Sequence, residues 1–508
     1  KKLKYLLNKR QKRFSIYLIV FLIFGMFLES LSLASVIPAI TALISDENPF
    51  AYINIDLISN LTSRFNKIDL TEIVLFGLVI IYFLKTLYMI FLTYGQNRFI
   101  YNLYASFSKQ LLQYYLEESY AFHLKNNSSK MVKNFLREIS NLVALTKSLI
   151  TLTTEIFLFS SIVLTVIVLD PISAFIIGGT MFVVFITFSL VTKKRINFYS
   201  EKREYLDTKI SKIVTESLNG IKEIKINNLK NFFLKSFNGY QNLNSLYARN
   251  YHTILSIPKF LFEFTALLSL IVFIMINLYM NVNINAILTS TGLFVIAAFK
   301  IVPSLNKILN GFQTVRYYKN SLDIFYKYLV NTKILDESSI EKNINFSKEI
   351  EFKKLSFSYN KSQKKILYNI NLILKANTII GIMGDSGTGK STFVDILSGL
   401  LLPTDGFFAV DNIDINSYNI ASWKKSIGYV PQNVYLVDDT LKNNIAFGIN
   451  EELIDERRVE NCIKITGLEN FVKNKKEGLN YFVGEFGSRL SGGQRQRVGI
   501  ARALYREP

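Results

Sequence analysis

Six long runs of apolar residues dominate the first 310 positions of the chain. Each run is long enough to cross a lipid bilayer as a helix, which takes about 20 mostly apolar residues. The runs cover residues 14–42, 70–95, 144–169, 171–192, 260–280 and 286–310. They form three pairs, and the third and fourth runs are joined only by Asp170-Pro171. The pattern predicts an all-α membrane domain with six spans.

Basic residues between the runs indicate the orientation of the spans. The amino-terminal tail and the segments 98–143 and 193–259 are rich in Lys and Arg, as cytoplasmic segments are. Loop 45–69 has only two basic residues against four acidic residues. We therefore expect both termini in the cytoplasm and this loop outside. Within the loop, apolar residues of segment 57–68 share one helical face, which predicts a short helix on the membrane surface or packed on neighbouring helix ends.

Composition supports a membrane protein and argues against a nucleic-acid partner. Apolar residues make up 50% of the chain and charged residues only 19%, whereas soluble proteins carry about 25% charged residues. The net charge of +20 lies between the apolar runs and not in an aromatic-interleaved patch that could stack bases. Cys462 is the only cysteine, so the sequence contains no intramolecular disulfide and no cysteine cluster for a metal.

The character of the sequence changes after residue 330. The cytoplasmic segments continue the helical period of the spans, and this pattern runs on to about Val330. Polar residues without a clear period follow, which predicts a linker. Short β-rich runs such as TIIGIMG then alternate with helical segments, which indicates an α/β domain on a partly parallel sheet. We expect a membrane domain over 1–330, a linker over 331–349 and an α/β P-loop NTPase domain over 350–508.

Residues 384–391 match the phosphate-binding pattern G-x-x-x-x-G-K-[ST] between a predicted strand and a predicted helix. The glycines let backbone N–H groups converge on a phosphate, and the helix directs its positive end at the same anion. Lys390 would bridge the terminal phosphates of ATP, and the Ser391 hydroxyl would hold Mg²⁺. The other residues expected at this nucleotide are Gly384, Asp385, Ser386, Gly387, Thr388, Gly389 and Thr392.

A second glycine-bearing anion site begins the predicted helix of RLSGGQRQRVGIARAL. It consists of Ser491, Gly492, Gly493 and Gln494. One nucleotide rarely needs two such loops from one chain. Two chains packed head to tail, however, would place each P-loop opposite the second loop of the partner. The sequence therefore predicts a dimer through the nucleotide-binding domains, and we expect a homodimer.

Together these motifs resemble those of the ABC transporter family, and the order of the domains resembles its exporters. The resemblance implies an ATP-hydrolysing transporter of the bacterial inner membrane, with segment 490–494 as the signature motif. It also implies that Gln432 contacts Mg²⁺ and that Tyr359 stacks on adenine, although an edge-strand surface tyrosine is the alternative for Tyr359. Phe486 stands where exporters usually have an arginine in the loop before the signature motif.

The resemblance implies two further features of the family. Segments 119–130 and 223–233 look like its coupling helices, although plain ends of helical hairpins fit the same residues. In the family, a strand with the catalytic carboxylates and then a switch histidine follow the signature helix. This sequence reaches Pro508 where that strand should begin, so we expect these residues to lie beyond Pro508 and the α/β domain to be incomplete at its carboxyl end.

Charged residues inside the predicted spans indicate a substrate cavity, because such residues are costly in a bilayer and usually face a cavity. The candidates are Lys85 and Lys300, near mid-membrane, and Lys259, at the cytoplasmic start of the fifth span. A basic cavity would suit an anionic substrate. The alternative is that these lysines pair with the nearby acidic residues Glu29, Glu155 and Glu263.

The basic cavity and the outward helix resemble features of lipid-linked oligosaccharide flippases of bacterial N-glycosylation. The resemblance implies membrane lipid and a polyprenyl-pyrophosphate glycan as partners. Lysine stands in this sequence where those proteins have arginine, and lysine lacks the bidentate fork for phosphate. Two alternatives remain open: an ABC exporter of lipid, drug or peptide, and a regulatory ABC protein without turnover.

Overall fold

The computed structural model divides the chain into two compact units. Lys1–Glu117 and Asn126–Thr332 form the first unit, whereas Glu118–Lys125 and Lys333–Pro508 form the second. The structure describes residues 2–36, 38–40, 67–282, 284–330, 344, 346–359, 365–416 and 419–508. Most of the predicted amphipathic helix over 57–68 and most of the predicted linker over 331–349 lie outside the described residues.

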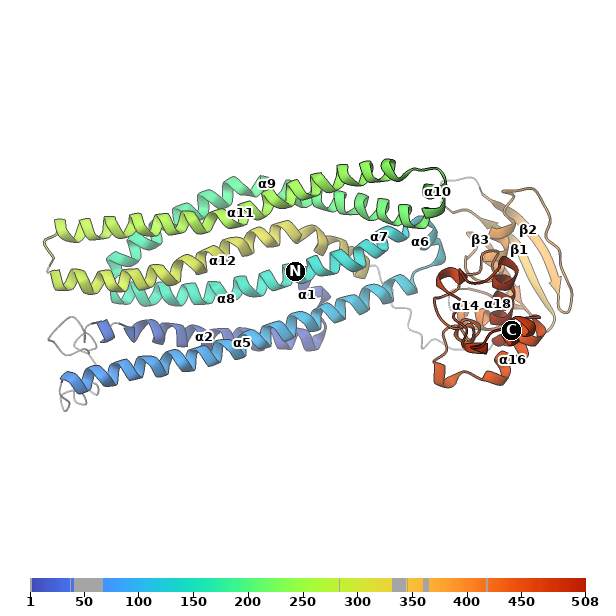
Figure 1. Ribbon diagram of the computed structural model, residues 1–508, viewed down its shortest axis with the longest axis horizontal. Coiled ribbons are helices and arrows are strands. Elements are labelled where there is room, and N and C mark those ends of the chain that lie inside the picture. The colour runs from blue at the N-terminus through green and yellow to red at the C-terminus, as the bar shows by residue number, and fades with distance from the viewer. Residues whose placement is uncertain are drawn as a thin grey trace. The chain divides into compact units, whose positions relative to one another are not determined.

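Six long helices build the first unit (Figure 1). They are α2 (Lys9–Ala34), α5 (Lys67–Glu117), α8 (Ile139–Leu169), α9 (Pro171–Asn219), α11 (Lys230–Tyr279) and α12 (Ile284–Val330). Six helices of the described chain are long and apolar enough to cross a membrane. The prediction of an all-α domain with six spans is therefore confirmed. Shorter elements complete the unit: α1 (Lys2–Leu6), α7 (Ser128–Lys133), the π-helical turn η1 (Asn134–Glu138) and α10 (Ile221–Ile226).

Local sequence determines where these helices begin and end. Asn8 caps α2 through a reciprocal pair of hydrogen bonds, in which each side chain of Asn8 and Gln11 accepts the backbone N–H of the other. Asp170 ends α8 and caps α9, and Pro171 occupies the first turn of α9, where its missing N–H costs nothing. This explains why two 30- to 50-residue helices follow each other without a loop.

The long helices continue well past the apolar runs, as the helical period of the segments 98–143 and 193–259 predicts. Helix α9 has 49 residues, which corresponds to about 74 Å at 1.5 Å per residue. An apolar core joins α2, α8, α9, α11 and α12 around residues such as Leu33, Ile162, Ile177, Phe262, Phe294 and Leu309. Outside the apolar runs, a smaller core of Ile196, Tyr251, Ile254 and Tyr317 continues the packing. Polar contacts join it, for example the bond from the Ser200 hydroxyl to the Tyr317 carbonyl at 2.6 Å.

The second unit contains a four-stranded sheet in the order β2-β1-β3-β4. Its strands are β1 (Glu349–Phe357), β2 (Leu367–Lys375), β3 (Asp405–Val410) and β4 (Ile413–Asp414). All three pairings are antiparallel, which corrects the expectation of a partly parallel sheet. The segment TIIGIMG, expected as a strand, pairs with none of the described strands, and Ile379 and Met383 are almost fully exposed. A strand gains its stability from cross-strand neighbours, so β-rich composition alone does not make this segment a strand.

Helices surround this sheet and form a second core beside it. They are α6 (Tyr120–Lys125), α13 (Lys390–Leu397), α14 (Ile420–Lys425), α15 (Leu441–Ile445), α16 (Glu456–Ile465), α17 (Glu469–Lys473) and α18 (Gly492–Tyr505), with the 3₁₀ turns η2 (Glu451–Leu453), η3 (Gly478–Asn480) and η4 (Glu485–Gly487). Phe352, Phe408 and Trp423 are central to the sheet core, and Leu441, Val459 and Val498 to the helical core. An all-α membrane domain followed by an α/β domain is confirmed as the fold class.

Residues 118–125 group with the second unit, although the predicted membrane domain covers all of 1–330. Ala121 of α6 packs against the sheet core, and this apolar contact explains why the short segment groups with the second unit. The first predicted coupling segment, 119–130, therefore contains residues of both units. The second, 223–233, lies within the first unit.

Candidate functional site

The P-loop leads directly into helix α13. Gly389 precedes the helix with φ +96°, a left-handed conformation that side chains disfavour. A Cβ at this position would lie 3.0 Å from side-chain atoms of both Ile366 and Leu367. Two constraints therefore require glycine at position 389: the left-handed backbone conformation and the close approach of the loop to β2.

The ammonium group of Lys390 lies within the turn of the P-loop. Its Nζ donates hydrogen bonds of 2.6 Å to the carbonyl oxygens of Gly384 and Asp385. The Thr388 hydroxyl donates to the Asp385 carbonyl at 2.9 Å and closes the turn. The positive ammonium and the positive end of α13 thus converge on one small, exposed region that also holds Ser386 and Gly387. This arrangement fits the phosphates of a nucleotide.

The residues expected at Mg²⁺ are exposed and uncharged. Ser391 lies in the first turn of α13, and Gln432 lies after α14. Among the described residues, no group of three or more His, Cys, Asp and Glu could hold a metal ion. Mg²⁺ commonly keeps several waters and binds one or two protein groups together with substrate phosphates. The hydroxyl of Ser391 and the amide oxygen of Gln432 fit that kind of ligation.

The structure brings Tyr359 beside the P-loop helix. Its hydroxyl lies 3.3 Å from the hydroxyl of Thr392, which is itself buried near the start of α13. The Tyr359 ring contacts Phe357 edge to face at 5.0 Å. These two contacts fix the ring next to the nucleotide-binding loop, and its stacking on adenine remains a prediction.

The signature segment forms the start of helix α18. The Ser491 side chain accepts the N–H of Gln494 at 3.3 Å, and the Gln494 side chain accepts the N–H of Ser491 at 2.8 Å. A Cβ added at Gly492 or Gly493 would meet nothing within 4 Å in the described chain. Neither glycine is needed for packing within the described part of the chain, so both leave the positive start of α18 uncovered for an external anion.

Arg502 joins α18 to the segment after Gln432. No sequence motif around Arg502 predicts this role. Its guanidinium donates to the Tyr435 carbonyl at 2.7 Å and to the Asn444 carbonyl and side-chain oxygen at 2.9 and 3.2 Å. It also lies over the Phe447 ring at 4.7 Å. Burial lowers the pKa of Arg502, and the neighbouring charge of Arg506 adds to this effect.

Phe486 reaches the same segment from the loop before the signature motif. Its ring packs edge to face on Tyr435 at 5.8 Å. Phe486 has φ +52°, an unusual value for a residue with a side chain. The side chain is more than half exposed, so its contact with Tyr435 leaves much of the ring open.

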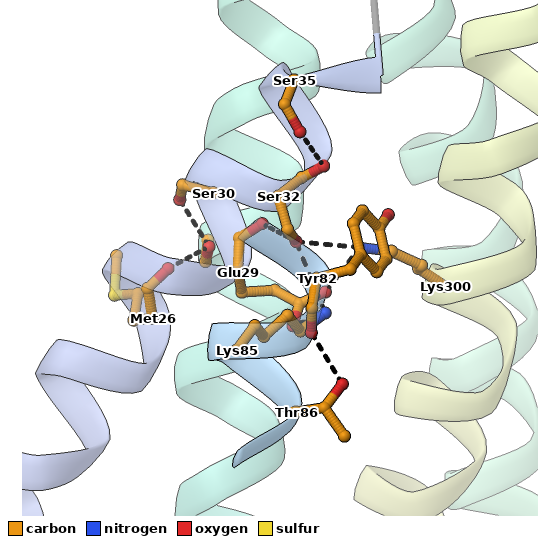
Figure 2. A network of polar contacts seen from close by, with 10 residues as sticks. Met26, Glu29, Ser30, Ser32, Ser35, Tyr82, Lys85, Thr86 and Lys300 are labelled. Atoms are coloured by element: carbon orange, nitrogen blue, oxygen red, sulfur yellow. Dashed lines mark hydrogen bonds and ion pairs between the residues drawn. The ribbon is translucent and has the colours of Figure 1, made fainter. Parts of the chain in front are cut away.

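In the membrane unit, Lys85 and Lys300 meet on a single carboxylate (Figure 2). The Nζ of Lys85 lies 2.6 Å from one oxygen of Glu29, and the Nζ of Lys300 lies 2.7 Å from the other. All three side chains are at most 16% exposed. The Ser32 hydroxyl lies 3.4 Å from each ammonium, and the Tyr82 ring centroid lies 5.3 and 5.4 Å from them. We refer to these five residues as the Glu29 cluster.

All residues of the Glu29 cluster except Ser32 line a cavity of about 510 Å³. A second ion pair borders the same cavity, with the Nζ of Lys307 2.7 Å from Glu155. The Ser304 hydroxyl donates to the other Glu155 oxygen at 2.9 Å. The remaining lining residues are apolar: Leu158, Ile162, Val295, Ile296, Phe299 and Pro303. Three lysines and two glutamates give the cavity a net charge of +1.

Lys259 lies outside this cavity, whereas the prediction groups it with Lys85 and Lys300. Its side chain is 60% exposed and lies 3.9 Å from Glu263, one turn further along α11. It borders a different, apolar pocket of about 470 Å³. Lys307, in contrast, is not among the predicted residues, although it follows Lys300 by seven residues. That spacing places both on one helical face and is the signal that identifies Lys307.

These features define a class: membrane proteins in which six spanning helices are joined to a P-loop nucleotide-binding domain. Comparison with known families is more specific. The model of the ABC transporter transmembrane region matches residues 12–302, and the ABC transporter model matches residues 367–508. The first match alone covers more than half of the chain. The chain belongs to the ABC transporter family.

Individual relatives agree with this assignment. An export ATP-binding/permease protein of Rickettsia typhi is 43% identical over 160 residues, but the match spans 31% of this chain and only 27% of that relative. An ATP-dependent lipid A-core flippase of Ralstonia nicotianae is 26% identical over 82% of this chain and 70% of its own length. A multidrug resistance-like ATP-binding protein of Buchnera aphidicola is 27% identical over 87% and 76%.

A solved structure shows the same fold. The structure of a bacterial Atm1-family ABC exporter with ATP bound superposes with a TM-score of 0.75 at 18% sequence identity. The superposition covers 98% of this chain and 84% of that chain. At this level of identity, the likeness concerns the fold of the chain and not its substrate.

Proposed function

We propose that the chain belongs to an ATP-driven exporter or flippase that moves an anionic lipid-linked saccharide across the bacterial inner membrane. The Glu29 cluster is the observation that carries the substrate class, because it places two buried ammonium groups in an apolar-walled cavity. Charged side chains are costly at such positions and commonly mark a substrate path. The basic cytoplasmic segments support an orientation with both termini inside.

The nucleotide-binding residues support ATP as the energy source. Bound ATP and Mg²⁺ would supply the free energy of phosphoryl transfer. Lys390 and the N–H groups of the P-loop would hold the phosphates, while Ser391 and Gln432 would hold the metal. Tyr359 would bind the base from its position beside α13.

A head-to-tail homodimer is the assembly that uses the second anion site. The start of α18 is exposed, and its two glycines make no close contact in the described chain. In a dimer with twofold symmetry, Ser491 and these glycines of one copy would face the P-loop nucleotide of the other copy. Each nucleotide would then be held by both chains.

An anionic lipid fits the cavity for two reasons. Its phosphate oxygens can take the place of the Glu29 carboxylate between the ammonium groups of Lys85 and Lys300, which are point charges that bind phosphate from many directions. Its hydrocarbon part can lie along the apolar walls. A polyprenyl-pyrophosphate glycan offers two neighbouring phosphates and is the substrate that we favour within this class.

Reconstitution of the full-length protein in liposomes tests the proposal. Fluorescent polyprenyl-pyrophosphate glycan should cross the membrane only with ATP. Lys300→Gln should weaken the apparent affinity roughly 10- to 100-fold, since it removes a charged hydrogen-bond donor. Glu29→Gln should strengthen it, because both lysines lose their competing carboxylate. Lys259→Gln is the matched control and should change little, since Lys259 lies outside the cavity.

Two outcomes would contradict the substrate class. If Glu29→Gln and Lys300→Gln both weaken lipid binding, the cluster only maintains the helix packing. If the lipid does not move while drugs stimulate ATP hydrolysis, the protein is a drug exporter instead.

A further inference from the structure

The π-helical turn η1 connects α7 to α8 and holds an unusual ion pair. The Nζ of Lys133 lies 2.6 Å from a carboxylate oxygen of Glu138, five residues later. In an α-helix, residues five apart point about 140° away from each other, at 3.6 residues per turn. A π-helix forms i→i+5 hydrogen bonds and so brings such residues together. This ion pair therefore depends on the π-helical geometry.

The turn is also buried. The side chains of Lys133 and Glu138 are each 2% exposed. Between them, the Asn134 side chain is buried and donates to the hydroxyl groups of Tyr115 and Tyr328 at 3.2 Å each. Removal of one partner of such a buried pair leaves an uncompensated charge, which is strongly unfavourable. Specific polar contacts, rather than apolar packing alone, thus hold η1 in its π-helical form.

A second buried cation lies next to this pair without a carboxylate partner. Arg203 of α9 donates one hydrogen bond, to the Ser321 hydroxyl at 3.3 Å, and lies over two tyrosine rings at 4.7 Å each. Within the described part of the chain, its Nε and Nη1 have no hydrogen-bond partner, and it forms no ion pair. Arg203 lies close enough to Glu138 for its positive charge to stabilise the Glu138 carboxylate. Asp207, the nearby alternative acceptor on α9, is occupied by Arg137.

We propose that residues 134–138 form a two-state element of the transport cycle. In the first state, which the structure shows, the π-helical turn pairs Glu138 with Lys133. In the second state, the turn becomes a regular α-helix, which separates Glu138 from Lys133 and transfers it to Arg203. Buried arginine N–H groups that lack an acceptor in the first state gain one in the second. Each state leaves one buried cation without the carboxylate, Arg203 in the first and Lys133 in the second, so these two costs oppose each other and make the element bistable.

Such a conversion would move helix α8. A π-helical turn holds one residue more than an α-helical turn. Its conversion to an α-helix therefore shifts α8 against α7 by one residue, which corresponds to about 1.5 Å along the axis and about 100° of rotation. Helix α8 carries Glu155, whose ion pair borders the cavity. On the other side of α7 in the sequence, residues 118–125 group with the nucleotide-binding unit. In the sequence, η1 therefore lies between residues 118–125 of the nucleotide-binding unit and Glu155 of the cavity.

Two variants with opposite expected effects test this proposal. Lys133→Met removes the partner of Glu138 in the π-helical state, and Arg203→Gln removes its partner in the α-helical state. In full-length protein in lipid nanodiscs, the two variants should shift the half-saturating ATP concentration in opposite directions, each by roughly 2- to 30-fold. Lys212→Gln is the matched control, since Lys212 forms an exposed ion pair on the same helix as Arg203. A purely structural role predicts shifts in the same direction, and that result, or no shift, overturns the proposal.

Amide hydrogen exchange provides a measurement on the unaltered protein. Exchange at residues 134–139 should change roughly tenfold or more when ATP and vanadate trap the protein, because a minor state becomes the major one. Unchanged exchange would overturn the proposal even if a variant does not fold. Failure of the wild-type protein to bind ATP would contradict the proposed function instead. In that case, Lys133→Met and Arg203→Gln must still change this exchange in opposite directions for the two-state element to stand.

Discussion

Substitution of Arg502 by Lys should destabilise the nucleotide-binding unit although the charge is kept. The guanidinium makes three hydrogen bonds that join α18 to two residues of the segment after Gln432. A lysine can reach only one of these acceptors, so two bonds to a charged donor are lost. At the lower end of the range for charged donors, which suits a partly exposed group, the loss is about 3 kcal/mol. For a domain of this size, that lowers Tm by roughly 6 to 12 °C.

Tryptophan fluorescence measures this effect selectively. Trp423 is the only tryptophan of the sequence, and it is buried in the sheet core of the nucleotide-binding unit with its indole N–H bonded to the Leu397 carbonyl at 2.7 Å. Thermal unfolding followed at this residue therefore reports on that unit and not on the membrane helices. Arg497→Lys is the matched control, because Arg497 is exposed and donates one bond, to the Gly467 carbonyl. If Arg502→Lys melts within about 2 °C of this control, the hydrogen bonds of Arg502 do not hold α18 in place.

Two further predictions concern the same unit. Gly389→Ala should greatly weaken ATP binding, measured with a fluorescent ATP analogue. The substitution adds a side chain to a left-handed residue, at a cost of roughly 1–2 kcal/mol, and this side chain also clashes with β2. Unchanged affinity would show that the loop geometry does not matter for the nucleotide. Hydrogen bonds from the N–H of Glu349 and its neighbours lower the pKa of Asp411 to about 2, below the ordinary 3.8. The folded form is thus stabilised above about pH 4, and this contribution is lost as the pH falls through about 2. Asp411→Asn should reduce the loss of stability at low pH, measured as the Tm of Trp423 fluorescence between about pH 5 and pH 2. An unchanged dependence of Tm on pH would show that Asp411 does not make this contribution.

Features that depend on contiguous residues could be predicted from the sequence. The six spans follow from the apolar runs, and the start of α18 follows from SGGQ, because the capping bonds of Ser491 and Gln494 join residues three apart. The P-loop belongs to the same kind, since Gly389 and Lys390 act through the adjacent backbone. In each case, the chemistry is local, and no knowledge of the packing is needed.

Features that depend on packing could not be predicted in the same way. Lys259 and Lys300 look alike as charges at apolar runs. Lys259 lies beside Glu263 of its own helix, four residues later, whereas only the packing of α12 against α2 places Lys300 on Glu29. Arg502 has backbone carbonyls as its main partners, and these leave no trace in the sequence. The Lys133–Glu138 pair has no sequence signal, because its spacing of five residues has meaning only in a π-helix.

The net charge of the cavity connects the proposed substrate with the proposed assembly. Three lysines against two glutamates leave +1 in one chain. Two identical copies around a shared path would carry +2. A pyrophosphate joined on one side to a lipid and on the other to a sugar carries two negative charges at neutral pH, so it would neutralise such a path. Charge balance matters most where water is scarce, since an unpaired charge in a low dielectric is costly. A dimer with only one Lys300→Gln chain should therefore lose more affinity for the pyrophosphate lipid than for a lipid with a single phosphate. Equal losses for the two lipids would show that the lysines do not act as a matched pair.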